Sequence, residues 1–279
     1  KRNVVSGIWS NKDERKTVVT RGINNEIIKK YNDMTYAYKF EDKALFNNLF
    51  NKYLNREWIY IKESSIEDFK KYLKGKKEVI VKPLSLSCGK GVEKIVVKDY
   101  KPEELYNHLM QTDQTLVEDV AIQNKVLSDL YPHSVNTLRI VTLNKVVVAA
   151  LLRIGNKGNV VDNFNHDGMV TTVDIKTGEI KYPAIDKVGN VYEVHPETNV
   201  KIVGIKIPMW NEVKKLCIEA CDIVPELGYV GWDVCLGEEK PFLIEGNDFP
   251  GHDLYQLPVH RKDNYGLLPE FEKAMKEGK

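Results

Sequence analysis

Apolar residues recur at helical spacing in several segments of the chain. Between positions 42 and 54 the pattern predicts a helix with Asp42 as its N-terminal cap. Residues 66–73 and 123–130 predict two further short helices, and residues 210–224 predict a longer one. The apolar face of the longer helix is expected to consist of Trp210, Val213, Cys217, Ala220, Cys221 and Val224.

Short runs rich in β-branched residues lie between these segments and predict strands. The predicted strands are 79–81, 92–97, 116–119, 138–143, 146–152, 169–175, 229–236 and 242–247. Turns are expected at Asn144-Lys145, at 176–179 and at 237–240, each joining two strands into a hairpin. Because hairpins dominate and helices are few, the pattern favours an α+β fold over a doubly wound parallel sheet.

Composition and charge exclude several classes of protein. The 279 residues are 42% hydrophobic and 29% charged, as in a soluble globular protein with one large domain or two lobes. A formal charge of +1 provides no electrostatic footprint for nucleic acid. No apolar run approaches the roughly 18 residues needed to span a bilayer, and the N-terminal residues lack the apolar core of a secretory signal. Partners of the nucleic-acid and membrane classes are therefore not expected.

The cysteines and the N-terminal segment add two smaller points. Cys88, Cys217, Cys221 and Cys235 are too scattered for a disulfide framework and fit reduced thiols in the cytoplasm. The first 35 or so residues are polar and charge-rich, which predicts an exposed extension or a helical arm. The chain begins with Lys rather than Met, which is compatible with processing or trimming.

The loop Cys88-Gly89-Lys90-Gly91 has two interpretations. A Walker phosphate-binding loop needs Lys followed by Ser or Thr at the start of a helix, whereas here Gly91 and a Val/Ile-rich strand follow. The loop can therefore act as a glycine flap whose amides cover a triphosphate, with Lys82 as a fixed positive charge before it. Taken alone, the loop more often indicates an ordinary hairpin turn.

The last predicted hairpin contains a candidate metal site. Glu245 and Asn247 lie two residues apart on one strand and therefore share a face. With Asp233 on the partner strand they offer hard oxygen ligands suited to magnesium. A four-residue loop at 237–240 would turn Asp233 to the opposite face, so the site requires a three-residue loop or a bulge. The alternative is a pair of solvated acidic residues on an outer strand.

Seven motifs in order resemble the ATP-grasp superfamily over residues 36–258. They are Asp42-Lys43, Val81-Lys82-Pro83 with the glycine flap, Leu116-Val117-Glu118-Asp119, Asn136-Thr137-Leu138-Arg139-Ile140 with Leu152-Arg153, Asp162-Asn163, Gly231-Trp232-Asp233 and Ile244-Glu245-Gly246-Asn247. Within the superfamily the chain is similar to RimK-like ligases and looks closest to the sugar-transfer-associated branch. The resemblance implies an α+β ATP-grasp fold in which two lobes hold ATP between antiparallel sheets. It implies an N-terminal extension at 1–35 and a catalytic unit at 36–279, with lobes at about 36–118 and 119–279.

The resemblance also implies roles for individual residues. Phosphate or flap contacts are carried onto Lys43, Lys82, Ser87, Gly89 and Lys90, and the hinge that reads the adenine edge onto Glu118, Asp119 and Val120. Gln123 is matched to a ribose contact. Residues beside the transferred phosphate and the acylphosphate are matched by Arg139, Arg153 and Asn163, and the Mg²⁺ ligands by Asp233, Glu245 and Asn247. For each lysine or arginine taken singly, a solvated side chain or a surface ion pair is the competing interpretation.

The activity implied is an ATP- and Mg²⁺-dependent ligase that joins a small-molecule carboxylate to an amine through an acylphosphate. An amino acid or a sugar acid in polysaccharide biosynthesis is the implied setting. Two alternatives stay open: a kinase of the same superfamily, and a non-catalytic nucleotide-binding protein. Amide formation that depends on added amine would separate the ligase from the kinase. Related ligases carry a preceding α/β domain, whereas the N-terminal segment here is short and polar.

Overall fold

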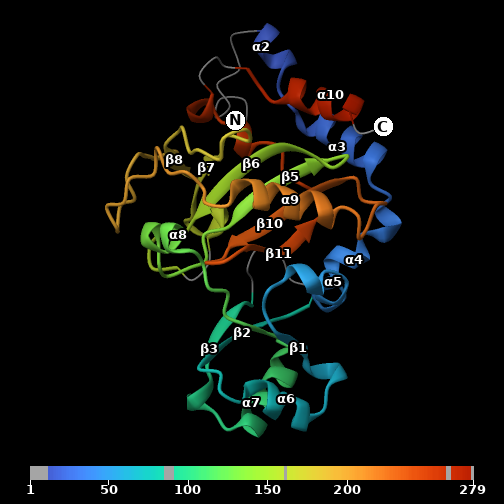
Figure 1. Ribbon diagram of the computed structural model, residues 1–279, viewed down its shortest axis with the longest axis vertical. Helices are drawn as coiled ribbons and strands as arrows, with labels where there is room; N and C mark the ends of the chain where they lie inside the picture. Colours follow the sequence, from blue (N-terminus) through green and yellow to red (C-terminus); the bar gives the residue numbers. More distant parts are fainter. Residues whose placement is uncertain (1–11, 85–90, 160–161, 262–264, 278–279) are drawn as a thin grey trace. The chain divides into compact units, whose positions relative to one another are not determined.

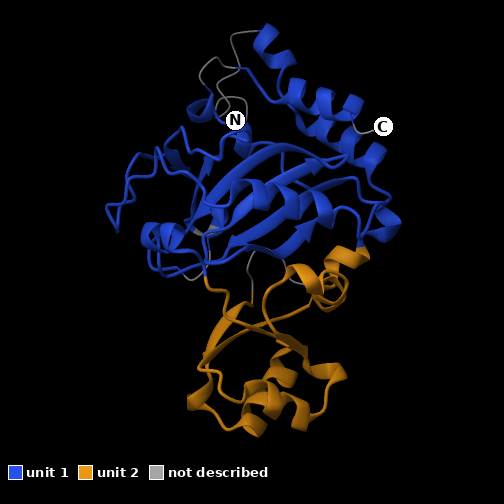
Figure 2. Cartoon of the chain, viewed as in Figure 1, with its two compact units in different colours: residues 1–37, 123–279 blue, residues 38–122 orange. Residues whose placement is uncertain are grey.

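The computed structural model describes residues 12–84, 91–159, 162–261 and 265–277. The chain forms two compact units, coloured separately in Figure 2. The smaller unit is Tyr38–Ile122, and the larger unit combines Lys1–Ala37 with Gln123–Lys279. In the parts of the chain that are described, no helix is both long and apolar enough to cross a membrane.

The smaller unit is built on a four-stranded antiparallel sheet of order β1-β4-β2-β3 (Figure 1). Its strands are β1 (Trp58–Tyr60), β2 (Glu78–Lys82), β3 (Glu93–Val96) and β4 (Leu116–Asp119). Helices α6 (Ile66–Leu73) and α7 (Pro102–Thr112) pack together beside the sheet, and α4 (Tyr38–Glu41) and α5 (Lys43–Leu49) precede it. Alternate residues of β2, Val79 and Val81, are fully buried against Phe69 and Leu105, as expected for a strand with one core face.

Capping side chains set the helix starts in this unit. The Asp42 carboxylate accepts hydrogen bonds from the backbone N–H groups of Ala44 and Leu45, which confirms its predicted role at the start of α5. Ser65 and Asp68 form a reciprocal capping box on α6, whose bounds match the prediction. The helix predicted to reach position 54 is shorter, because α5 ends at Leu49 and a 3₁₀ turn, η2 (Asn51–Tyr53), follows.

The larger unit is built on a seven-stranded antiparallel sheet of order β11-β10-β5-β6-β7-β8-β9. The strands are β5 (Leu138–Leu143), β6 (Val146–Ile154), β7 (Met169–Thr172), β8 (Ala184–Asp186), β9 (Val191–Tyr192), β10 (Tyr229–Leu236) and β11 (Pro241–Asn247). The helices are α2 (Lys12–Lys16), α3 (Arg21–Tyr31), α8 (Lys125–Leu130), α9 (Trp210–Ala220) and α10 (Leu268–Glu277). This unit therefore combines one antiparallel sheet with helices on both of its faces, in agreement with the α+β prediction.

The two faces of the larger sheet carry different helices. Val141, Leu143 and Tyr229 face a core shared with α3 and α10, which contribute Ile27, Ile28 and Phe271. On the other face, Thr142 and Trp232 lie against α9, where the Thr142 hydroxyl contacts Cys221 Sγ at 3.4 Å. All six residues predicted for the apolar face of this helix and its continuation are buried.

The predicted hairpins agree with the structure in two cases and differ in one. Asn144 and Lys145 both have positive φ, as a tight turn between β5 and β6 requires. β10 and β11 form the last hairpin as expected. After β7, however, the next strand to pair is β8 at 184–186, and the segment directly after 176–179 bonds instead to 205–206. The prediction of a hairpin at 176–179 is therefore wrong, because its second strand does not pair with β7.

The described part of the N-terminal segment, from Lys12 onward, forms α2 and α3, as the helical alternative predicted, and α3 packs into the core of the larger unit. Helix α3 begins at its Thr20 cap and buries Ile27 and Ile28 in the core of the larger unit. The buried Asn32 side chain donates to the carbonyls of Tyr229 (2.8 Å) and Asp248 (2.7 Å) and accepts from the Tyr229 N–H (2.8 Å). These bonds tie the segment to the start of β10.

Candidate functional site

Charged side chains converge on one face of the larger sheet. Asp233 on β10 lies directly across from Arg139 on β5 in the register. The Arg139 guanidinium forms a two-point contact with the Asp233 carboxylate through Nε and through Nη2, the latter 3.0 Å from Oδ2. Arg153 on β6 donates to the same Oδ2 at 3.1 Å. The two arginines that the resemblance sets beside the transferred phosphate therefore lie together, and both contact the Asp233 carboxylate.

A β-bulge brings Asp233 and Glu245 to the same face. Leu236 pairs with Pro241 across the four-residue loop 237–240, a register that would oppose Asp233 to Ile244. The register shifts after Val234, so that Ile244 is left over and Asp233 pairs with Glu245. The condition that the sequence set for the metal hypothesis is therefore met through the bulge.

Gly231 makes room for the Arg139 side chain. A Cβ atom at Gly231 would lie 3.1 Å from Arg139 Nη1 and 3.3 Å from its Cδ, closer than most side chains tolerate. The glycine of the Gly-Trp-Asp segment therefore lets the guanidinium lie across β10 on its way to Asp233.

Burial and charge act in opposite directions on this cluster. Burial alone would raise the pKa of the Asp233 carboxyl, but Arg139 and Arg153 outweigh it and hold the pKa below its ordinary value. Burial would likewise lower the pKa of Arg139, and Asp233 reverses that effect. Asp233 and Arg139 therefore stay ionised as a pair, and Arg153 and Glu245 lie beside them.

The donor set fits a hard divalent cation. Asp233 and Glu245 face each other across the hairpin, and Asn247, two residues along β11, pairs with Gly231. The Asn247 amide nitrogen donates to the Gly231 carbonyl at 3.3 Å, so the amide oxygen is the atom that it can offer to a metal. Two carboxylates and an amide oxygen suit magnesium completed by water or phosphate. No group of three or more His, Cys, Asp or Glu that could hold a metal occurs among the described residues.

Asp162, rather than Asn163, is the member of the Asp-Asn motif that lies toward the cluster. Its carboxylate accepts from the Thr137 N–H at 2.7 Å and from the Thr137 hydroxyl. Burial raises its pKa, and Arg153 counteracts that effect. The Asn163 side chain instead accepts from the Asn165 N–H as the cap of η5 (Phe164–His166). The structure therefore gives the Asn163 side chain a capping role, and the catalytic role that the resemblance implies for it stays a prediction.

Gln123 is also held by structural bonds. Its amide nitrogen donates to the carbonyls of Tyr131 (3.1 Å) and Ser134 (2.7 Å), and its oxygen accepts from the Asn136 N–H (2.9 Å) and side chain (3.1 Å). With both ends of the amide engaged, the side chain fixes the loop before β5. The ribose contact expected of Gln123 has no support in this arrangement.

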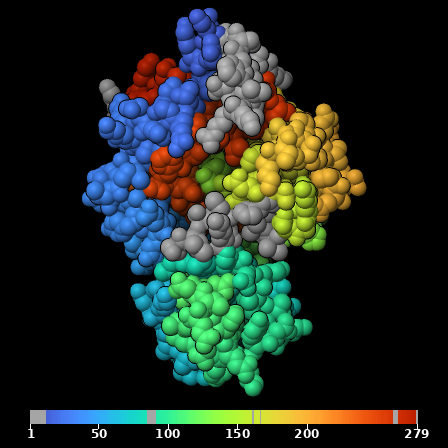
Figure 3. All heavy atoms as spheres, turned by 180° about the vertical axis from the view of Figure 1, so that it is seen from behind, coloured from blue at the N-terminus to red at the C-terminus, as the bar shows by residue number. Residues whose placement is uncertain are grey.

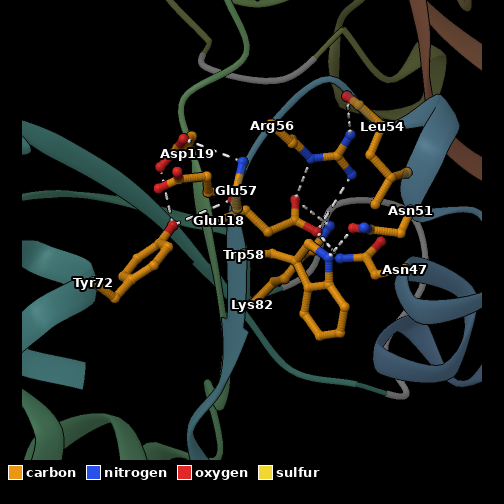
Figure 4. A network of polar contacts seen from close by, with 10 residues as sticks. All are labelled: Asn47, Asn51, Leu54, Arg56, Glu57, Trp58, Tyr72, Lys82, Glu118 and Asp119. Atoms are coloured by element: carbon orange, nitrogen blue, oxygen red, sulfur yellow. Dashed lines mark hydrogen bonds and ion pairs between the residues drawn. The ribbon is translucent and has the colours of Figure 1, made fainter. Parts of the chain in front are cut away.

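The smaller unit holds a second charged cluster, centred on Glu118 (Figure 4). The buried Glu118 carboxylate is 2.8 Å from Lys82 Nζ and 3.1 Å from Arg56 Nε, and it accepts from the Asn47 amide at 2.6 Å. Burial raises the pKa of this carboxyl, but Arg56 and Lys82 outweigh the effect and lower it to about 2. Lys82 is therefore held at the end of β2 beside an ionised carboxylate.

Other predicted nucleotide contacts lie near this cluster in the same unit. Lys43 Nζ donates to the carbonyl of Leu84, two residues beyond Lys82, at 2.8 Å. Ser87, Gly89 and Lys90 lie outside the described residues. The Asp119 side chain accepts hydrogen bonds from Tyr72 (3.1 Å) and Lys76 (2.6 Å). Any contact of Asp119 with the adenine edge would therefore come from its backbone. From 120 to 122 the backbone makes no hydrogen bond with any described residue.

Sequence reasoning missed Arg56 and Asn47. Asn47 lies within α5 and Arg56 follows this helix, and the spacing of neither residue indicates a contact with Glu118. The one signal was Glu118 itself, because a carboxylate inside the apolar strand 116–119 needs cationic partners.

The surface of the larger unit is hollowed beside the Asp233 cluster's sheet. Seen from behind in Figure 3, a recess opens between orange-red segments near the C-terminus and yellow-green segments, with green chain at its floor. The colour bar places the green chain near β5, which carries Arg139.

Two antiparallel α+β units, the glycine-linked strands and the Asp233 hairpin define an ATP-grasp protein. The chain belongs to the sugar-transfer-associated ATP-grasp family, whose model matches residues 22–273. Among curated proteins none matches the sequence.

Solved ATP-grasp ligases share the fold at low identity. The ATP-grasp ligase PsnB complexed with a minimal precursor is similar with a TM-score of 0.52 and 12% identity, over 88% of this chain and 63% of that one. The D-cycloserine synthetase DcsG has a TM-score of 0.51 and 10% identity, over 89% of this chain and 74% of that one. The present chain thus spans less than two thirds of the length of PsnB.

Proposed function

We propose that the protein is an ATP- and Mg²⁺-dependent ligase that activates a carboxylate as an acylphosphate and transfers the acyl group to an amine. The observation that carries the proposal is the Arg139–Asp233–Arg153 cluster, which the bulge in β11 sets beside Glu245 on one sheet face. Such a cluster supplies carboxylates for a cation and guanidiniums for phosphate oxygens, which phosphoryl transfer requires together.

The two units contribute different groups to this chemistry. In the smaller unit, Lys82 and Lys43 would bind phosphate oxygens, and the backbone at Asp119–Val120 would read the adenine edge. In the larger unit, Asp233, Glu245 and Asn247 would hold magnesium, which when bound neutralises charge on the nucleotide phosphates. Arg139 and Arg153 would stabilise charge on the transferred phosphoryl group.

The proposed reaction needs no protein nucleophile. A substrate carboxylate oxygen attacks the γ-phosphorus, the bond to the bridging oxygen breaks, and ADP leaves. An amine nitrogen then attacks the acyl carbon, the C–N bond forms, phosphate leaves with the bonding electrons, and the amine proton passes to the phosphate or to water. The protein acts by positioning and electrostatic stabilisation.

Known ligands of proteins with this fold support the choice of nucleotide and metal. PsnB has been solved with Mg and ADP and with a precursor peptide and AMPPNP. The family description, sugar-transfer-associated, supports an amino acid or a sugar acid in polysaccharide biosynthesis as the setting. A fold does not specify its substrate, so the acid and the amine are to be found by assay.

The test is an ADP-release screen with ATP and Mg²⁺ against paired panels of uronic or amino acids and amines. The proposal expects release that needs both an acid and an amine, with an amide in the product. A phosphorylated acceptor formed without amine would instead identify a kinase. Asp233→Asn should abolish turnover, whereas Asp222→Asn, which alters an exposed aspartate paired with Lys145, should leave it unchanged. Equal rates in the two variants would refute the role of the cluster.

A further inference from the structure

The carboxylate of Asp162 has one oxygen bound and one oxygen free. Oδ2 accepts from the Thr137 N–H at 2.7 Å and from the Thr137 hydroxyl. Oδ1 has no hydrogen-bond partner in the described part of the chain, and it is not among the buried unpaired atoms of these residues. Asp162 as a whole is half-buried. Oδ1 is therefore a carboxylate oxygen that a ligand can reach.

The Thr137 side chain lies on the sheet face that carries the Asp233 cluster. The Arg153 N–H donates to the Thr137 carbonyl at 2.9 Å, which extends the ladder between β5 and β6 by one pair. Thr137 is therefore opposite Arg153 and two residues before Arg139, so all three side chains share a face. The recess seen in Figure 3 has chain near β5 at its floor, and Thr137 directly precedes that strand. The hydroxyl of Thr137 thus holds Asp162 at one end of the face that the substrates would use.

The cations of this face contact Asp233 instead of Asp162. Both Arg139 and Arg153 donate to the Asp233 carboxylate. Among the described residues, no lysine, arginine or histidine lies within ion-pairing distance of the Asp162 carboxylate. Burial outweighs Arg153 in its effect on the pKa of the Asp162 carboxyl, so the charge of this carboxylate is only partly compensated. A cation bound at Oδ1 would complete the compensation.

We propose that Asp162 Oδ1 binds the ammonium group of the second substrate, which is therefore a primary amine that enters the site with its positive charge. A divalent cation needs several oxygen ligands, whereas Asp162 offers one free oxygen with Arg153 close by. An ammonium group carries a single charge and N–H donors, one of which satisfies Oδ1. It gives one proton to water before its nitrogen attacks, so Asp162 acts by binding and positioning. The assignment of this ammonium to the amine substrate rests on the proposed function, whereas ammonium binding at Oδ1 does not.

The experiment is an NMR titration of the full chain with glycinamide, which has an ammonium group and no carboxylate. The Thr137 amide is the reporter, because it donates to the carboxylate that binds the probe. We expect a saturable shift of this resonance, and an affinity at least about tenfold weaker in Asp162→Asn, as the loss of a charge-assisted hydrogen bond predicts. The Asn side chain keeps an oxygen for Thr137, so the variant retains that contact. The matched control is Asp167→Asn, in the same loop, which alters an aspartate paired with Lys157 and Lys187 and should bind as the wild type does.

Two results with the wild type alone would overturn the subsite: no saturable shift of the Thr137 resonance, or an equal shift with uncharged N-acetylglycinamide. A shift with Mg²⁺ but not with glycinamide would make Asp162 a metal ligand and would overturn it too, as would equal affinity in Asp162→Asn.

The ADP-release screen separates this proposal from the ligase proposal. For a productive acid and amine pair, Asp162→Asn should raise the KM for the amine about tenfold and leave the KM for ATP unchanged, since the same contact is lost. An unchanged KM for the amine would refute the subsite and leave the ligase. Glycinamide binding at Asp162 without any productive pair would refute the ligase and leave the ammonium subsite.

Discussion

Replacing Glu118 by Gln should destabilise the smaller unit more than any change to a surface ion pair. The carboxylate is buried against Arg56 and Lys82, so Gln leaves two buried cations without their counter-charge. A pKa lowered from 4.5 to about 2 corresponds to about 3 kcal/mol of stability, and breaking a buried pair typically costs about 3–5 kcal/mol. We therefore expect a loss of about 3 kcal/mol at pH 7.

The stabilisation that the Glu118 carboxylate provides is expected to decrease as the pH falls. The pKa of Glu118 is lower in the folded than in the unfolded chain, so the unfolded chain binds more protons as acid is added. The stabilisation is complete above about pH 4.5, declines below it, and is lost near pH 2. The difference between wild type and Glu118→Gln should shrink over that range.

Urea unfolding at pH 7 and at acidic pH is the assay, together with hydrogen exchange of the β2 and β4 amides to isolate the smaller unit. Glu103→Gln is the control, because Glu103 forms an exposed pair with Lys70 in the same unit and should matter by less than about 1 kcal/mol. Equal losses in the two variants, or a loss in Glu118→Gln that does not change toward pH 2, would refute the reasoning.

Three further changes test the larger unit. Gly231→Ala should lower turnover about tenfold or more, because its Cβ displaces Arg139, while urea unfolding changes little. Gly178→Ala should destabilise the protein by about 2–4 kcal/mol in the same unfolding assay, since Gly178 has φ +73° and a Cβ there would lie 2.5 Å from the Trp210 ring. Gln123→Ala should lower the melting temperature and leave the KM for ATP unchanged, whereas a ribose contact would raise that KM.

Local patterns predicted much of this fold because they act over a few residues. The caps at Asp42 and Ser65 and the turn at Asn144 are properties of adjacent residues, and each occurs where the pattern placed its element. The strand predicted after 176–179 is wrong because β7 pairs with β8, which follows it after an eleven-residue connection. Nothing in the local alternation encodes that longer connection.

The candidate site was less accessible from sequence, because its contacts join distant segments. The length of the loop alone did not decide on which sheet face Asp233 lies, because a loop of three residues and one of four place it on opposite faces. Only the bulge at Ile244, seen in the structure, decides it. Arg56 contacts Glu118 although the two residues are 62 positions apart in the sequence, a separation that no local pattern encodes. The spacing of residues did reveal the carboxylates of the last hairpin, Asp233 and Glu245, whereas Glu118 entered only through the family resemblance.

The two charged clusters differ in a way that fits their proposed roles. Around Glu118, two cations share one carboxylate, so the smaller unit keeps a surplus of positive charge at Lys82, where phosphate oxygens would bind. Around Asp233, two arginines face two carboxylates, so the side-chain charges balance and a bound divalent cation would give that cluster a positive surplus. Buried ions that balance only part of their charge are expensive to a fold, and replacing them by apolar residues is often stabilising. An anion such as a nucleotide phosphate would complete the balance around Glu118, and it would do so around Asp233 once a divalent cation is bound there.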